Sequence, residues 1–575
     1  MITSEIPQIV AFILAATPLN LFIIKKINKF IFKNHPKIGQ TTTICTNITG
    51  NLTEKYLIVR SVLFDRFKLT AEDHSDLIKI EDQQAKTEIL IEKIALQKDD
   101  FIQLMAICSN VCHFKKIQDL EYVMLKFFQK CGFNGHKINK EYEQIANIPS
   151  SEDKKISTTV VIKNDTKEIF SFSKGHPEKI LEKCSRILLN NTKIDLDANI
   201  RRKIKKEIER LENNGQKIIG FSYKGLPLKR FDNYTESFAE NEMTFIGMLG
   251  LTNAIKKDIL TSTEKATNAG IKTYVISDVK EKKAIALAQI LKLVNPQYFE
   301  SITGSYLEDI SDHKLDKMLG NKEKDFVFSQ LSEPQKMRIM NILRKHGETV
   351  AISDVHNQYK DIVESIEKGR LSNKNYIKYT RHTLSLKFAE IAIFLFAVLI
   401  KAPLPLTITS LLLIEIFVNL GLGLSLKQDK TEIDVMNKNF NPSINKIFTK
   451  KNLRPMFIDT LVISIFAGAL YVFNLVRFGW VQNETLLQTD NAYLKATTIT
   501  FSFLVIYQII KSFYLTSHKN SYLLLTSIIT ALCAYTMINF EFLSNKIGFT
   551  SLETIDYQIL GFYALIVIII EHLRK

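Results

Sequence analysis

Long apolar runs and one long polar block divide the chain. Residues 7–24 are almost entirely apolar and are about long enough to cross a bilayer. The polar block, residues 25–375, has the pattern of a water-soluble protein. Six further apolar runs follow it, at 383–401, 404–426, 457–475, 498–516, 521–541 and 556–571. The pattern predicts an integral membrane protein with one large insertion between its first and second spans.

The distribution of charge predicts on which side of the membrane the insertion lies. No Lys or Arg precedes the first apolar run, whereas the segment that begins at Lys25 is rich in Lys. Cytoplasmic flanks carry such an excess, so we expect the polar block in the cytoplasm and, for a bacterial protein, the spans in the plasma membrane. The net charge of +16 agrees with this. Lys is scattered and does not alternate with stacking aromatics, so the lipid bilayer is an expected partner and nucleic acid is not.

Within the polar block, strands and helices alternate. Strand-like runs occur at Thr42–Cys45, Lys272–Ser277 and Thr349–Ser353, and helical patterns at 254–269 and 333–345. This alternation is typical of a doubly wound parallel sheet. Ligands bind such sheets at the carboxyl ends of the strands. Residues that bind a ligand are therefore expected in the polar turns that follow the three strands.

Residues 59–245 interrupt the alternation. They contain the extended runs Ser157–Ile162 and Glu168–Phe172, a helical run at 202–213, and the sequence KGHPE at 174–178. We interpret this stretch as a second domain inserted into the first.

Seven segments together resemble type II, Ca²⁺-ATPase-like, P-type cation-transporting ATPases. The first, TTTICTNITGNLTE, is similar to the phosphorylation motif, and SKGHPEKILEKCSRIL is similar to the nucleotide-domain motif KGAPE. No single match is specific, but all seven keep the family's order and spacing. The segments are 41–54, 173–188, 245–259, 273–291, 328–358, 384–407 and 495–513.

The resemblance implies a multidomain membrane protein. Residues 1–35 would be the family's fourth transmembrane helix and a stalk, and 371–575 its fifth to tenth helices, forming an α-helical bundle. Residues 36–58 and 246–370 would form a cytoplasmic α/β phosphorylation domain of the haloacid-dehalogenase type. Residues 59–245 would be an inserted α+β nucleotide-binding domain. The family's first three helices and its actuator domain have no counterpart in this sequence.

The resemblance also assigns the catalytic positions, and one of them is altered. Asn47 stands at the position of the phosphorylated Asp, and an amide is a poor nucleophile. Thr49, Lys336 and Asn357 match other catalytic positions, and Asp354 matches a Mg²⁺ ligand. ATP and Mg²⁺ are implied as cofactors, but the loss of acidic residues predicts weak Mg²⁺ binding.

The nucleotide site is expected at Lys174, Gly175 and Asp278. The family places an adenine-stacking Phe where this chain has Ser150 or Ser151, so we expect weak ATP binding. An ordinary solvated lysine is the alternative for Lys174.

Six polar residues match the family's ion pathway through the membrane. Lys387 stands where an Asn ligand is usual, three residues before Glu390. We expect Lys387 to pair with Glu390 or Glu415 and to act as a built-in cation; the alternative is that it reaches toward the lipid headgroups. The six residues are Gln8, Lys387, Glu390, Glu415, Asn419 and Gln508.

Three functions are compatible with these features. The first is a pseudo-ATPase with a scaffold or regulatory role. The second is half of a split pump, completed by an actuator-domain partner protein; such a partner could not supply the nucleophile missing at Asn47. The third is an active ATP-driven cation transporter that uses another phosphate acceptor.

Overall fold

The computed structural model describes most of the chain after residue 37, and it divides into two compact units. One unit is residues 42–363 and the other contains residues 364–575. The described residues are 38–65, 67–71, 78–82, 87–91, 105, 120–130, 140–189, 192–227, 234–321, 324–354, 356–427, 429, 435–437, 449–482, 486–487, 490–516 and 520–574.

The first unit contains a five-stranded sheet in which all described pairings are parallel, as the alternating pattern predicts. The strand order is β14-β15-β13-β1-β16. Thr46, the last residue of β1, lies beside Val275 of β13 and Ser353 of β16, so the turns after these strands meet at one edge. The strands are β1 (Thr43–Thr46), β13 (Lys272–Ile276), β14 (Phe299–Thr303), β15 (Asp325–Ser329) and β16 (Val350–Ser353).

Helices α11 (Gly304–Asp309), α12 (Asp312–Gly320) and α13 (Glu333–Lys345) pack against this sheet through one apolar cluster. The helix predicted at 333–345 is α13. The helix predicted at 254–269 is shorter: α9 is Ile259–Asn268, because the preceding strand continues to Ile255 and a turn with Asp258 at φ 67° follows. α10 (Glu281–Ile290) lies between β13 and β14 in the chain.

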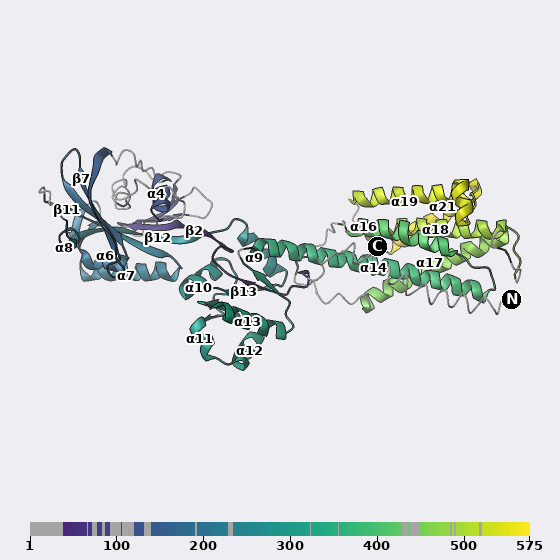
Figure 1. The fold of residues 1–575 in the computed structure, drawn as a ribbon, viewed down its shortest axis with the longest axis horizontal. Coiled ribbons are helices and arrows are strands. Elements are labelled where there is room, and N and C mark those ends of the chain that lie inside the picture. The colour runs from purple at the N-terminus through teal and green to yellow at the C-terminus, as the bar shows by residue number, and fades with distance from the viewer. Residues whose placement is uncertain are drawn as a thin grey trace. The chain divides into compact units, whose positions relative to one another are not determined.

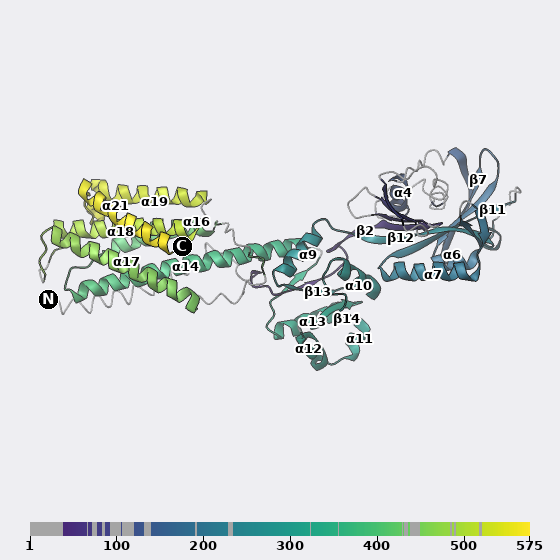
Figure 2. The ribbon, with the colours of Figure 1, turned by 180° about the vertical axis from the view of Figure 1, so that it is seen from behind.

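A second, largely antiparallel sheet of eleven strands forms the inserted domain. Its path is β5-β4-β3-β2-β12-β11-β8-β7-β6, and β9 joins β12 and β10 off this path. β2 and β12 are long and connect the two sheets (Figures 1 and 2). The strands are β2 (Thr53–Phe64), β3 (Phe67–Ala71), β4 (Ile78–Asp82), β5 (Thr87–Ile91), β6 (Tyr142–Ile148), β7 (Ile156–Lys163), β8 (Ile169–Gly175), β9 (Cys184–Leu189), β10 (Thr192–Asp195), β11 (Lys217–Leu226) and β12 (Met243–Ile255).

Helices cover both faces of this second sheet (Figure 1). α4 (Leu120–Lys130) packs on one face, and α6 (Pro177–Lys183) and α7 (Ala198–Asn213) pack on the other. Successive residues of β11 point to opposite faces, so Ile218 joins the cluster under α6 and α7 while Ile219 joins the cluster under α4. A short helix, α8 (Glu236–Ala239), precedes β12.

The second unit is a helical bundle, and five of its described helices are long and apolar enough to cross a membrane. The span expected at 404–426 is divided by a π-helical turn, η2, at Ile414–Asn419. The span expected at 7–24 lies outside the described residues. The helices are α14 (Tyr359–Leu399), α15 (Ile408–Leu413), η2, α16 (Leu420–Lys427), α17 (Lys450–Arg477), α18 (Asn491–Leu515), α19 (Ser521–Asn539), α20 (Glu541–Ile547) and α21 (Thr554–Leu573).

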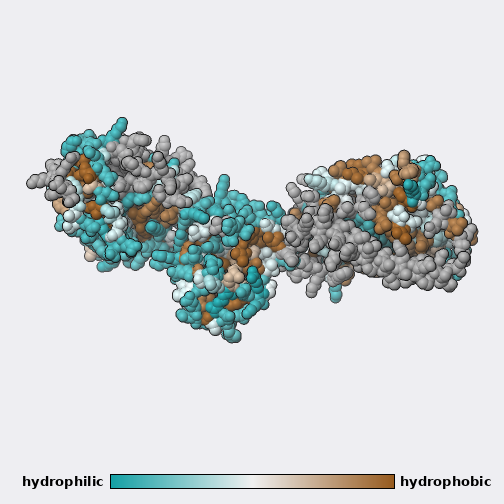
Figure 3. Space-filling view, viewed as in Figure 1, coloured by the Kyte–Doolittle hydropathy of each residue, from teal (hydrophilic) through white to brown (hydrophobic). Residues whose placement is uncertain are grey.

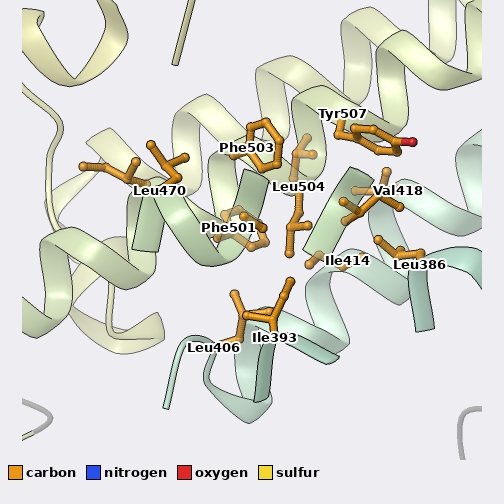
Figure 4. Packing of buried hydrophobic residues seen from close by; sticks show 14 of the residues in the cluster. Leu386, Ile393, Leu406, Ile414, Val418, Leu470, Phe501, Phe503, Leu504 and Tyr507 are labelled. Carbon is orange, nitrogen blue, oxygen red and sulfur yellow. The ribbon is translucent and has the colours of Figure 1, made fainter. Parts of the chain in front are cut away.

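α18 is buried along most of its length and supplies much of the core of the bundle. Leu504 and Tyr507 of α18 meet Leu386 of α14 and Ile414 and Val418 of η2 (Figure 4). By contrast, α19 and α21 expose many large apolar side chains, and apolar residues gather on the described surface of this unit (Figure 3). An outer surface of this kind fits contact with lipid.

Candidate functional site

The turn after β1 carries Asn47, whose side chain is half-buried at the edge where three strands end. Its amide oxygen accepts two hydrogen bonds, from the Ser277 hydroxyl at 2.7 Å and from the backbone N–H of Ile48 at 2.7 Å. The oxygen is therefore held by neighbours on two strand ends. A side chain at this place is positioned for contact with a ligand, but this one is neutral.

Asn51 organises the same edge and was not expected from the sequence. It is fully buried, and its amide nitrogen donates to the Thr46 hydroxyl at 2.8 Å and to the Ser353 hydroxyl. Its amide oxygen accepts a hydrogen bond of 2.9 Å from the backbone N–H of Tyr359, which is the first residue of α14. One side chain thus joins β1, β16 and the start of the helix that leads to the bundle. Its place after Thr49 and Gly50 is the one signal the sequence offered.

Asp354 and Asn357 form a compact turn after β16. The Asp354 carboxylate accepts from the backbone N–H groups of His356 at 2.8 Å and Asn357 at 2.7 Å. The Asn357 N–H, followed by that of His356 and the His356 charge, lowers the pKa of Asp354 below its ordinary value, while slight burial opposes this. The carboxylate is exposed and ionised, with one oxygen engaged by the backbone.

The other positions expected to be catalytic are less closely connected. The Lys336 ammonium is 2.7 Å from Glu333 on its own helix. Thr49 is half-buried in the turn, and Asp278 is exposed at the end of β13, where its carboxylate is 3.4 Å from the Ser277 hydroxyl. Among the contacts of the described residues, none joins Lys336 to Asn47. The strand-end positions are brought together as predicted, and the lysine is engaged elsewhere.

A cavity of about 1280 Å³ lies between the second sheet and α10. Lys174 and Gly175, two of the three residues predicted for the nucleotide site, line it, whereas the third, Asp278, does not. The Lys174 ammonium is 3.1 Å from Glu121 of α4. Ser150 also lines it, at the place where a stacking Phe is usual in the family. The lysines in its lining are Lys155, Lys174, Lys217, Lys280, Lys282 and Lys283.

Five of these lysines were not expected from the sequence, and three of the five lie close together in the chain. Lys280, Lys282 and Lys283 lie at the start of α10, and Lys283 donates to the Asn253 side chain at 2.6 Å. Burial lowers the pKa of Lys283, and the charge of Asp278 opposes this shift. The signal for these three was available in the run KEKK, which follows the last residue of β13 after three intervening residues, 277–279.

A buried ionic cluster links α14 and η2 in the membrane unit. Lys387 pairs with Glu390 at 2.8 Å and also with Glu415. The Asn419 amide donates to Glu415 at 3.0 Å. The exposed fractions of the Lys387, Glu390 and Glu415 side chains are 10%, 6% and 2%. The expected pairing of Lys387 is therefore present with both carboxylates, and one cation faces two anions.

Gln508 of α18 is fully buried, and its amide has no hydrogen-bond partner among the described residues. It follows Tyr507, whose ring packs close to Val418 of η2 (Figure 4). Gln8, the remaining residue expected in the ion pathway, lies outside the described part of the chain.

Two further, partly buried ion networks connect helices of the bundle, and in each the charges balance. In one, Arg477 and Lys495 share Asp556, at 2.6 and 3.4 Å, and Lys495 also reaches Glu553. The other consists of Asp459, Lys511, Glu571 and Arg574.

Comparison with known families identifies both units. Residues 89–258 match the family described as P-type ATPase, cytoplasmic domain N. Residues 403–575 match the family described as cation transporting ATPase, C-terminus. Together these matches cover more than half of the chain. The chain belongs to the P-type cation-transporting ATPase family.

Its relatives among well-characterised proteins are distant. Potassium-transporting ATPase alpha chain 2 of Homo sapiens is 25% identical over an alignment of 472 residues, which covers 70% of this chain and 45% of that protein. Sodium/potassium-transporting ATPase subunit alpha-A of Artemia franciscana is 24% identical over an alignment of 441 residues, which covers 64% of this chain and 43% of that protein. The chain spans less than half the length of these two relatives.

P-type ATPases use Mg²⁺, but the strand-end residues of this one do not fit the ion well. Mg²⁺ prefers carboxylates and phosphates in octahedral geometry. Asp354 offers a carboxylate that is partly engaged by backbone N–H groups, while Asn47 and Gln358 are amides. In the described part of the chain, no group of three or more His, Cys, Asp or Glu side chains could hold a metal ion.

The residues of the cavity fit the phosphates of ATP better than its base. Six lysines and three glutamates, Glu121, Glu212 and Glu281, line it. Lysine ammonium groups bind phosphate oxygens through charge-assisted hydrogen bonds. Lys174 on one wall and Lys280 on the other are the lining residues that would hold the phosphates if ATP bound there.

Proposed function

We propose that this chain is a pseudo-ATPase: a membrane protein of the P-type ATPase family that forms no phosphoenzyme and acts as a scaffold or regulator. Residues 36–58 and 246–370 form its phosphorylation domain, and residues 59–245 its nucleotide domain. It lies in the plasma membrane of a bacterium with these domains in the cytoplasm, and it works with a pump or actuator-domain partner protein.

The side chain of Asn47 carries the proposal. Phosphoryl transfer to a carboxylate needs an anion aligned with the γ-phosphate. Asn47 is neutral, and its oxygen already accepts from Ser277 and Ile48. Attack by an amide oxygen would also require the loss of a proton from its nitrogen. Removing an essential nucleophile lowers the rate of an enzyme by on the order of 10⁶ in a well-studied protease.

A second observation concerns transport. Lys387 occupies the space between Glu390 and Glu415 with its own ammonium group. A divalent cation at this place would have to displace a buried, paired charge, and breaking such a pair is costly. The proposal therefore includes a membrane site that is occupied by the protein itself.

The test is phosphoenzyme formation. The purified protein is incubated with [γ-³²P]ATP and Mg²⁺, quenched in acid and separated on an acidic gel, beside an active P-type pump as positive control. We expect label on the control and none on this chain. Acid-stable, hydroxylamine-sensitive label on a peptide that contains Asn47, or ATP hydrolysis coupled to ion movement, would overturn the proposal.

A further inference from the structure

The wall that α10 contributes to the cavity is unusually basic. Lys280 is the N-cap of α10, and Lys282 and Lys283 lie in its first turn. Lys280 and Lys282 are exposed, and no ion pair is recorded for either among the described residues. The N-terminus of a helix also carries a partial positive charge. The ammonium groups and the helix end together favour a ligand with several negative charges.

The opposite wall is basic as well. Lys155 precedes β7, Lys174 is the last residue but one of β8, and Lys217 begins β11. The two walls are held close together: a Cβ placed on Gly215 would be 3.3 Å from the Cα of Lys283. Positive charge thus faces the cavity from two domains, and a chain of phosphates could contact both.

By contrast, the described lining offers little to a nucleobase. It contains no Phe, Tyr or Trp, and its apolar members are Leu57, Leu120, Ile218, Ile219, Leu251 and Val279. Where a site has an aromatic ring, stacking on it contributes much of the affinity for a base. Without such a ring, most of the affinity has to come from the phosphates.

We propose that this cavity is a polyphosphate site that needs no metal ion and discriminates poorly between bases, with Lys280, Lys282 and Lys283 as its specificity-determining residues. The ammonium groups take the place that Mg²⁺ holds on a bound triphosphate elsewhere. The ligand is a triphosphate chain, either of a nucleotide or of inorganic polyphosphate. The proposal deepens the proposed function, since a protein that does not transfer phosphate has no need to orient a γ-phosphate on a metal.

The test is equilibrium binding to the full-length protein in detergent, by isothermal titration calorimetry in EDTA at fixed ionic strength. The probes are ATP, GTP, sodium tripolyphosphate and AMP. We expect the first three to bind within about threefold of one another, and AMP more than roughly tenfold more weakly, because charge sets the affinity. The comparison of ATP with tripolyphosphate distinguishes a nucleotide ligand from inorganic polyphosphate.

Two matched triple variants show which lysines are responsible. K280Q/K282Q/K283Q should bind ATP and tripolyphosphate at least roughly tenfold more weakly than the parent, since three charge-assisted contacts are lost. K203Q/K205Q/K206Q removes three exposed lysines of α7 that do not line the cavity and should change either affinity by less than about twofold. Single K280Q and K282Q variants, which alter exposed side chains, replace the triple variant if its thermal unfolding differs from that of the parent.

Three results would overturn the inference: binding of ATP more than tenfold tighter than that of GTP and tripolyphosphate, binding that requires Mg²⁺, or equal affinities of the α10 variant and the parent. No binding of any triphosphate in EDTA would overturn it as well. Each of these can occur while phosphoenzyme formation is absent, so the inference can fail while the proposed function stands.

Discussion

Replacing Lys387 by Met removes the ammonium group from the buried cluster and keeps a side chain of similar length. Glu390 and Glu415 then face each other, and no other cation pairs with them in the described part of the bundle. A buried carboxylate without a partner has to gain a proton or a cation. The variant is therefore expected to be less stable than the parent, and its stability is expected to increase when cations are added.

The size of the effect follows from burial. Lys387, Glu390 and Glu415 are all at least nine-tenths buried, so solvent screens their interactions little. Breaking a buried pair by removing one partner destabilises a protein by about 3–5 kcal/mol. At about 2–4 °C per kcal/mol for a unit of about 200 residues, the apparent melting temperature should fall by roughly 6–20 °C.

The assay is thermal unfolding of the detergent-purified protein at a fixed scan rate, in choline chloride and in KCl of equal concentration. For K387M, KCl should restore part of the lost stability, because an ion bound only to the folded state stabilises it. The parent should unfold at the same temperature in both salts.

A matched control is available in the same bundle. Lys495 is also buried and paired with Asp556, but Arg477 lies 2.6 Å from the same carboxylate. K495M should therefore be destabilised less than K387M and should not respond to KCl. Two results would show that the interpretation of Lys387 as a built-in cation is wrong. One is an equal unfolding temperature of K387M and the parent. The other is an equal increase of the unfolding temperature by KCl in both proteins.

Three further predictions concern the first unit. Asn51→Ala leaves the backbone N–H of Tyr359 and two hydroxyls without their partner, so chemical denaturation should show a loss of about 2–4 kcal/mol; unchanged stability would contradict the role of Asn51 at the strand edge. Burial raises the pKa of Cys45 to about 12, so its thiol should stay protonated at pH 8 and react with a thiol reagent only after unfolding; rapid reaction of the native protein, followed by mass spectrometry of the labelled peptide, would contradict this. Gly215→Val introduces a side chain at φ 74° against α10, so limited proteolysis between the two sheets should be faster than in the parent, and equal rates would show that this contact is unimportant.

Much of the fold could be predicted because local patterns of apolar and polar residues indicate its elements. Apolar runs of bilayer length identify the spans, and strands followed by helices identify a parallel sheet. The same argument places the turns with Asn47, Asp278 and Asp354 at one edge of the sheet, since parallel strands that lie side by side end at the same edge. The predicted start of α9 was wrong. The preceding strand, β12, continues to Ile255, and the apolar pattern there does not distinguish a strand from a helix.

The sequence by itself identified a membrane protein of the P-type ATPase family, and the resemblance predicts that an amide, Asn47, stands at the position of the nucleophile. It could not determine the partners of charged side chains, because these come from segments far apart in the chain. Only the tertiary structure joined Lys387 to Glu415, engaged Lys174 with Glu121, and placed the lysines of α10 opposite those of the second sheet. The physical reason is that an ionic interaction depends on distance and burial, and neither is fixed until the helices and sheets have packed.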